Sequence, residues 1–211
     1  MTIIAFVSQK GGVGKSTLSR ALGREAAKSG LSVKIADLDP GQGTTTEWGR
    51  VRTAAGIEPL VPVQLYRAAV DAMVEADRHD LLIIDGPAKT SAATLDIAKA
   101  ANLVVQPTGA SRDDLVPAVR EFHALVKKGI PKERLHLALV RIGTDAEEAD
   151  ARAFLAEAGY SVLPGSLPER PAYRMTQNEG RAVTEVKFAT LQKQAEALVQ
   201  AIIDETIAAS V

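Results

Sequence analysis

Residues 9–17 read Gln9-Lys10-Gly11-Gly12-Val13-Gly14-Lys15-Ser16-Thr17, and they follow an apolar, β-branched run at residues 3–7. A helical pattern begins at Lys15 and is stopped by Gly30. Glycines let the backbone curl so that successive N–H groups point inward, and the following helix adds its positive N-terminal end. An ordinary Gly-rich turn would explain the glycines but not Lys15-Ser16. The segment therefore predicts a phosphate-binding loop between a strand and a helix.

Short apolar runs alternate with longer helical patterns along the rest of the chain. The expected strands are residues 3–7, 32–38, 81–85, 103–105 and 137–140. The expected helices are residues 15–29, 44–56, 66–76, 92–101, 113–128, 147–158 and 187–209. Apolar runs without alternation are typical of parallel strands that are covered on both faces. We therefore expect a doubly wound α/β fold, with a mainly parallel sheet and helices on both faces, in a single domain over residues 1–211.

Composition excludes several classes of protein. The 211 residues include no cysteine, so disulfides, thiolate metal sites and thiol nucleophiles are excluded. Lys and Arg number 25 against 26 Asp and Glu, which excludes nucleic-acid binding through total charge but leaves room for a local basic face. No run approaches the roughly 20 apolar residues that cross a bilayer, so we expect a cytoplasmic protein.

The loop carries the side chains that phosphate chemistry needs. Lys15 would reach the β- and γ-phosphates, and the Ser16 hydroxyl would be a ligand of Mg²⁺. The general pattern G-x-x-x-x-G-K-[ST] requires glycine at the position of Gln9, so the loop departs from it at its first residue.

Two further segments place carboxylates at the ends of expected strands. Asp85 closes an apolar strand and is followed by Gly86-Pro87, the Walker B arrangement in which an aspartate holds Mg²⁺ through a water. Asp37 and Asp39 end the second strand. For Asp37, a role in chemistry and a role as the cap of the helix at 44–56 stay equally open.

The segment at residues 10–17, K-G-G-V-G-K-S-T, resembles the deviant Walker A motif of the ParA/MinD family of ATPases. The resemblance implies an ATPase with ATP and Mg²⁺ as cofactors, slow turnover, and an ATP-sandwiched homodimer in which Lys10 crosses to the partner's phosphates. From residue chemistry alone, Lys10 could be another cation near its own phosphate. By similarity, Asp39 would orient the attacking water and contact the Mg²⁺ shell. Gly41-Gln42-Gly43 replaces the family's usual glutamine after Pro40, which leaves the geometry of this switch segment open.

The expected site residues form three overlapping sets. The nucleotide-binding set is Lys10, Gly11, Gly12, Val13, Gly14, Lys15, Ser16, Thr17 and Arg141. The catalytic set is Lys10, Lys15 and Asp39, and the metal set is Ser16, Asp39 and Asp85. Arg141 would lie near the adenine, as a nearby polar residue does in relatives, although a surface arginine is an equally good interpretation.

Family members differ in what the ATP-bound dimer binds. Similarity to partition ATPases implies nonspecific DNA binding through Arg170, Arg174, Arg181 and Lys187, and a cargo-bound activator protein, with the ATP-bound form on the nucleoid. Glutamates interleave with these cations, so a mixed-charge surface is the alternative.

A MinD-type protein would instead end in a basic membrane helix, but the last helix carries Asp204 and Glu205 and is expected to pack on the sheet, not on a membrane. A metabolic kinase or ligase is a third interpretation. The cargo itself is not encoded in any motif.

Overall fold

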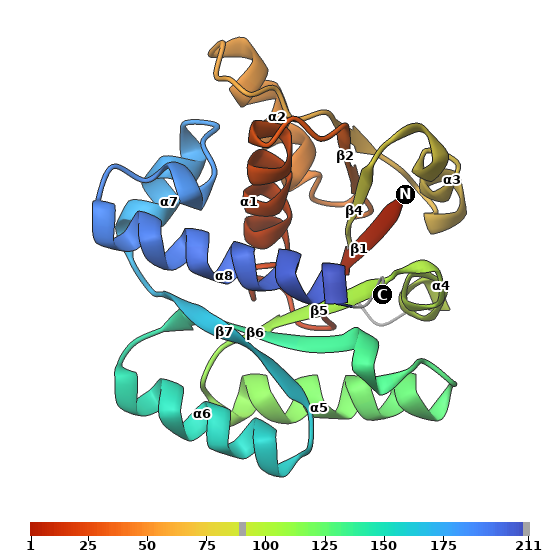
Figure 1. The fold of residues 1–211 in the computed structure, drawn as a ribbon, viewed down its shortest axis with the longest axis vertical. Helices are drawn as coiled ribbons and strands as arrows, with labels where there is room; N and C mark the ends of the chain where they lie inside the picture. Colours follow the sequence, from red (N-terminus) through yellow and green to blue (C-terminus); the bar gives the residue numbers. More distant parts are fainter. Residues whose placement is uncertain (89–91, 209–211) are drawn as a thin grey trace.

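The computed structural model describes residues 1–88 and 92–208, with one seven-stranded sheet at its centre (Figure 1). The strands are β1 (Thr2–Phe6), β2 (Val33–Asp37), β3 (Val63–Leu65), β4 (Leu81–Asp85), β5 (Leu103–Thr108), β6 (Leu135–Ile142) and β7 (Ser161–Pro168). They lie in the order β3-β2-β4-β1-β5-β6-β7, and every described pairing is parallel. The expected doubly wound parallel fold is confirmed.

Helices cover both faces of this sheet. They are α1 (Lys15–Lys28), α2 (Thr44–Ala54), α3 (Ala69–Met73), α4 (Ala92–Ala100), α5 (Arg112–Lys127), α6 (Asp145–Glu157), α7 (Pro171–Asn178) and α8 (Ala189–Ala208). Short 3₁₀ turns lie at η1 (Ala76–Arg78), η2 (Lys132–Arg134) and η3 (Val183–Glu185). One core cluster packs α1, α2, α7, η3 and α8 on one face, and a second packs α3 to α6 on the other.

The register of the central strands brings the motif residues together. Phe6 of β1 and Asp37 of β2 both pair with Asp85 of β4. Because parallel strands all end at the same edge, the loop after β1 and the carboxylates after β2 and β4 meet there.

Residues 66–76 do not form the single helix that we expected. The Tyr66 N–H donates to Asp37 O at 2.9 Å, which continues the pairing of β3 with β2 and keeps Tyr66 extended. Helix α3 is therefore a single short turn, and η1 follows it. The three-residue strand β3 was not among the expected strands.

Strand β7 was also missed, because Pro164 and Gly165 interrupt its apolar pattern. Its pairing with β6 shifts register between Leu137 and Leu139. An edge strand tolerates such residues because one of its sides needs no ladder hydrogen bonds.

Helix α8 packs on the sheet, as expected. Ala195, Leu198, Val199 and Ile202 are buried in the core, whereas Phe188 and Ile207 are exposed. Ala209, the last residue of the expected helix, lies outside the described residues. Among the helices of residues 1–88 and 92–208, none has the length and apolar character of a membrane span.

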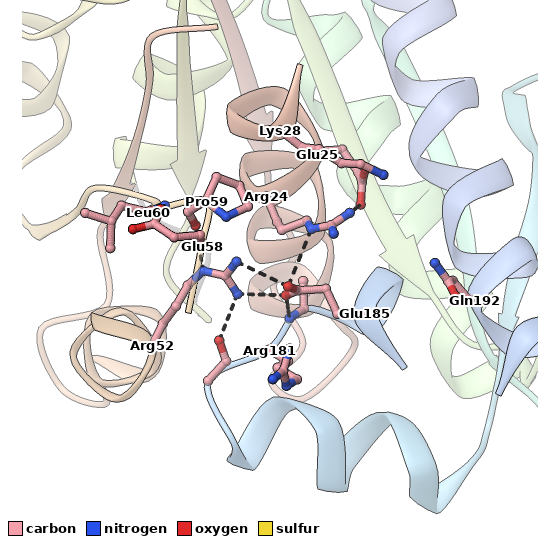
Figure 2. Close-up of polar contacts among 12 residues, drawn as sticks. Arg24, Glu25, Lys28, Arg52, Glu58, Pro59, Leu60, Arg181, Glu185 and Gln192 are labelled. Carbon is pink, nitrogen blue, oxygen red and sulfur yellow. Dashed lines mark hydrogen bonds and ion pairs between the residues drawn. The ribbon is translucent and has the colours of Figure 1, made fainter. Parts of the chain in front are cut away.

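A buried ion-pair cluster joins three elements at the end of α2 (Figure 2). Arg52, only 1% exposed, donates from Nη1 to Glu185 Oε2 at 2.7 Å and from Nη2 to Glu185 Oε1 at 3.2 Å. Its Nε donates to Pro59 O at 3.0 Å, and Nη1 also reaches Gly180 O at 3.1 Å. Arg24 of α1 lies 3.5 Å from the same carboxylate. The cluster therefore ties α1, α2 and η3 together.

We expect Arg52→Met to lower the free energy of unfolding by about 3–5 kcal/mol, because Glu185 would keep a buried charge without its bidentate partner. Arg50→Met is the matched control: the Arg50 side chain is 75% exposed and should change stability by less than about 0.5 kcal/mol. Urea unfolding of both variants tests this, and equal stabilities for the two would contradict it.

Candidate functional site

A cavity of about 740 Å³ opens at the edge where the strands end. It lies between the loop after β1, the start of α1, the segment after β2, and the chain from the end of β6 to α7. Its lining includes Gly11, Gly12, Gly14, Lys15, Ser16, Thr17, Arg20, Asp39, Gln42, Thr44, Arg141, Glu169, Arg170, Tyr173, Arg174 and Gln177. Most of the expected nucleotide-binding residues are thus brought to one cavity, although Val13 is buried and does not line it.

The loop adopts the backbone that its glycines permit. Gly12 and Gly14 have φ values of 73° and 102°, in the left-handed region that favours glycine. A Cβ on Gly14 would also lie 3.3 Å from the Val140 side chain. Helix α1 begins directly after Gly14, so its unpaired N–H groups face the cavity in the way an anion site requires.

Lys15 is buried at the base of the loop. Its Nζ donates to Ser8 O at 3.4 Å and to Lys10 O at 3.3 Å. Burial lowers the pKa of Lys15, and the nearby charges of Asp85, Asp39 and Glu121 oppose that shift. A cation held among carboxylates in this way is placed to meet phosphate oxygens.

Asp85 lies beneath the cavity at the end of β4 and is 2% exposed. Thr45 donates its hydroxyl to Asp85 Oδ2 at 2.6 Å, while Asp85 Oδ1 has no hydrogen-bond partner within the described chain. Burial raises the pKa of Asp85 to about 6, and the hydrogen bond from Thr45 opposes this rise.

The residues around Asp85 fit a Mg²⁺ ion. A buried carboxylate oxygen without a partner is a hard ligand for a metal ion, and the Ser16 hydroxyl is close enough to Asp85 to oppose the rise of its pKa. Residues 1–88 and 92–208 hold no group of three acidic or histidine side chains that could form a metal cage. Mg²⁺ does not need one, because it commonly binds through one or two carboxylates together with phosphates and waters.

The structure separates the two aspartates at the end of β2. Asp37 Oδ2 accepts the backbone N–H of Thr46 at 2.9 Å and its hydroxyl at 3.0 Å, so the Asp37 carboxylate is occupied by the first turn of α2, whose N-cap residue is Gly43. Asp39 lines the cavity, and its Oδ1 accepts the Gln42 N–H at 3.2 Å. The segment Gly41-Gln42-Gly43 forms a turn that begins at Asp39, because the Gly43 N–H donates to Asp39 O at 2.7 Å.

Lys10 does not line the cavity. Its side chain pairs with Asp114 of α5, and its Nζ also donates to Asp113 O at 3.4 Å. That carbonyl is free of a helical partner because Pro117, four residues later, has no N–H to donate to it. The Lys10 side chain is 46% exposed and therefore accessible from outside the chain.

Arg141 extends over the loop from the end of β6. Its Nη1 donates to Gly12 O at 3.3 Å, and its Nε donates to Glu169 at 3.1 Å. The φ of Arg141 is 58°, which is rare for a residue with a side chain. These contacts place Arg141 at the cavity rather than on a remote surface.

The four expected DNA-binding residues fall into two groups. Arg170 and Arg174 lie at the cavity rim, where Arg174 pairs with the Glu169 carboxylate and Arg170 donates to Glu169 O at 2.9 Å. Arg181 follows α7, and its backbone carbonyl accepts the Trp48 indole N–H at 3.1 Å. Lys187 is exposed just before α8.

Comparison with known proteins identifies the family. The model of the CobQ/CobB/MinD/ParA nucleotide-binding domain matches residues 4–183. The chain belongs to this family. The maintenance of carboxysome distribution protein A of Gloeobacter kilaueensis is 28% identical over 184 residues, covering 86% of this chain and 83% of that protein. The chromosome-partitioning ATPase Soj of Thermus thermophilus is 36% identical over 136 residues, covering 51% of this chain and 54% of Soj.

Solved structures of ParA/MinD-type proteins share the fold. Apo McdA of Cyanothece superimposes with a TM-score of 0.74 at 20% identity, covering 96% of this chain and 99% of that chain. MinD of Pyrococcus furiosus gives a TM-score of 0.75 at 19% identity, covering 96% of this chain and 98% of that chain. The family model, together with the similarity to the ATPase Soj, identifies the protein as an ATPase of the ParA/MinD type.

Arg20 of α1 also lines the cavity, although it was not among the expected site residues. Arg20 Nε donates to the Thr45 hydroxyl at 3.2 Å, and Nη1 donates to Gln177 of α7 at 3.3 Å. Burial lowers the pKa of Arg20, while Asp85 and Asp37 oppose that shift. A signal was present, because Arg20 follows Ser16 by four residues and so shares its helix face.

We expect the stability of the nucleotide-free protein to report the pKa of Asp85. Because this pKa rises from 3.8 to about 6 on folding, the native state binds the proton more tightly, and stability is lost as pH rises through that window. Wild type should therefore lose free energy of unfolding relative to Asp85→Asn between pH 4 and pH 6, by up to about 3 kcal/mol, because asparagine does not titrate. Urea unfolding from pH 4 to 8 without Mg²⁺ measures it. A difference independent of pH would contradict the burial of this charge.

Proposed function

We propose that this ParA/MinD-type ATPase forms an ATP-sandwiched homodimer in which Lys10 reaches the phosphates bound by the partner. The position of Lys10 carries the proposal. It flanks the phosphate-binding loop, yet its side chain turns away from its own cavity toward α5 and stays half exposed. A cation placed in this way can serve a second nucleotide once it leaves Asp114 and the Asp113 carbonyl.

In this proposal, separate side chains bind the phosphates, hold the metal ion and orient the attacking water. The loop N–H groups and Lys15 bind the phosphates, and Arg141 stands over the loop near the nucleotide. Ser16 and Asp85 would hold Mg²⁺, and Asp39 would contact its coordination shell; the ion would supply neutralisation of the negative charge on the phosphate oxygens. Asp39 orients the attacking water, since its carboxylate lines the cavity and is held by the Gln42 N–H.

The dimer would act as a switch rather than as a producer of a metabolite. We propose that the ATP-bound form binds DNA nonspecifically through Arg170, Arg174, Arg181 and Lys187, and that a cargo-bound partner stimulates hydrolysis and release. The named functions of similar proteins, carboxysome distribution and chromosome partition, support a positioning role. The protein would then be cytoplasmic and lie on the nucleoid when ATP is bound.

Two substitutions separate binding from chemistry. Lys15→Ala should abolish ATP binding, because it removes the buried cation at the base of the loop. Asp39→Ala should keep ATP binding and dimerisation but reduce turnover at least about 100-fold, the low end of what a positioned catalytic group supplies. An aspartate-to-alanine variant of Cyanothece McdA has been solved as an ATP complex. ATP titration, sedimentation and phosphate release measure the three properties, and unchanged turnover in Asp39→Ala would overturn the mechanism.

DNA binding is tested by ATP-dependent retention of random-sequence DNA over a range of salt. Arg181→Ala/Lys187→Ala should weaken retention and make its salt dependence shallower by about one unit for each phosphate that is no longer neutralised. Lys127→Ala/Lys128→Ala, which removes two cations at the end of α5, is the charge-matched control and should change little. No retention at low salt with ATP, or retention on anionic vesicles instead, would overturn the DNA-binding proposal.

A further inference from the structure

A buried carboxylate lies directly behind the phosphate-binding loop. Glu121 of α5 is 2% exposed, and its Oε2 accepts the Gln9 N–H at 3.1 Å and the Gln106 side-chain amide at 2.8 Å. Gln106, on β5, is also 2% exposed. The remaining oxygens, Glu121 Oε1 and Gln106 Oε1, have no hydrogen-bond partner in the described structure. A cavity of about 10 Å³ lies between these side chains and the loop.

Such a residue is costly to keep in a core. Burial raises the pKa of Glu121, and no ion pair to it exists within residues 1–88 and 92–208; the charge of Lys15 acts on it only at longer range. A leucine would fill this part of α5 at lower cost if packing were its only role. What Glu121 supplies that leucine cannot is an acceptor for a backbone N–H.

That N–H belongs to the first residue of the phosphate-binding loop. Gln9 stands where the general pattern has glycine, and the next N–H, that of Lys10, is turned back onto the Ser8 hydroxyl at 3.2 Å. The Gln9 N–H therefore points into the protein rather than at a phosphate. Helix α5 also holds the next loop residue, because Asp114, two turns before Glu121, pairs with Lys10.

We propose that Glu121 is a positioning residue of the phosphate-binding loop: its Oε2 anchors the Gln9 backbone and so holds the loop in the form that binds ATP. The acceptor atom performs this role, and the negative charge does not. Removal of the acceptor leaves the Gln9 N–H buried without a partner and allows the start of the loop to shift.

Two conservative substitutions separate the acceptor from the charge. Glu121→Gln keeps an acceptor at the same reach without the charge, and its amide adds donors beside the partnerless oxygen of Gln106. Glu121→Asp keeps the charge but withdraws the carboxylate by one methylene. We expect Glu121→Gln to bind Mg²⁺-ATP within about twofold of wild type, and Glu121→Asp and Glu121→Leu to bind it about tenfold more weakly.

Turnover provides a readout that general destabilisation would not reproduce. The KM for ATP should rise in Glu121→Asp and Glu121→Leu while kcat at saturating ATP stays within about twofold, because Asp39 and Asp85 are untouched. Leu125→Ala is the control: Leu125 is buried in the same helix, one turn further from Gln9, so its removal lowers stability without changing ATP affinity.

The binding measurements use the full chain, calorimetric titration with Mg²⁺-ATP, and a temperature below each variant's unfolding midpoint. Wild-type affinity in Glu121→Asp would overturn the proposal even if Glu121→Leu failed to fold. Affinity in Glu121→Gln as weak as in Glu121→Asp would also overturn it, because the charge rather than the acceptor would then be required.

Discussion

The parallel pairing of β4 with both β1 and β2 is the constraint on which the site depends. It sets Asp37 and Asp85 side by side at one edge and brings the end of β1 to the same level, so that the phosphate-binding loop emerges over the two carboxylates. Each strand is an apolar run buried on both faces, and a slip by one residue would turn the carboxylates away from the cavity. The core therefore sets the geometry of the chemistry.

Buried charged side chains connect the elements around that edge of the sheet. Asp85 keeps one oxygen satisfied by Thr45 and one without a partner, which burial makes costly and a bound cation would relieve. Arg20 connects this corner to α7 through Thr45 and Gln177. At the far end of α2, Arg52 and Glu185 join the same layer of helices. Both ends of α2 are thus attached to the segment that follows β7.

Helix α5 supports the opposite side of the loop. Asp114 holds Lys10 near the surface, and Glu121 holds the Gln9 backbone in the interior. Pro117 lies between them and frees the Asp113 carbonyl that Lys10 also contacts. Helix α5, whose sequence pattern is that of an ordinary amphipathic helix, is thus in direct contact with Gln9, where the loop departs from the general pattern, and with Lys10, the lysine that follows it.

Local sequence patterns were enough to predict the parallel α/β fold, the loop, and the carboxylates at the ends of β2 and β4, because these features depend on unbroken apolar runs, glycine spacing and residues at strand ends. Tertiary packing set the features that depend on long-range contacts. It placed the Asp37 carboxylate on the first turn of α2, left Asp39 in the cavity, set Lys10 on α5, and brought Arg141, Glu169 and Arg20 to the same cavity. It also formed β7 despite Pro164 and shortened the helix expected at 66–76, since pairing with a neighbouring strand outweighs local preference. A single sequence records local propensity, whereas the partner of a buried polar group is chosen only when distant segments pack.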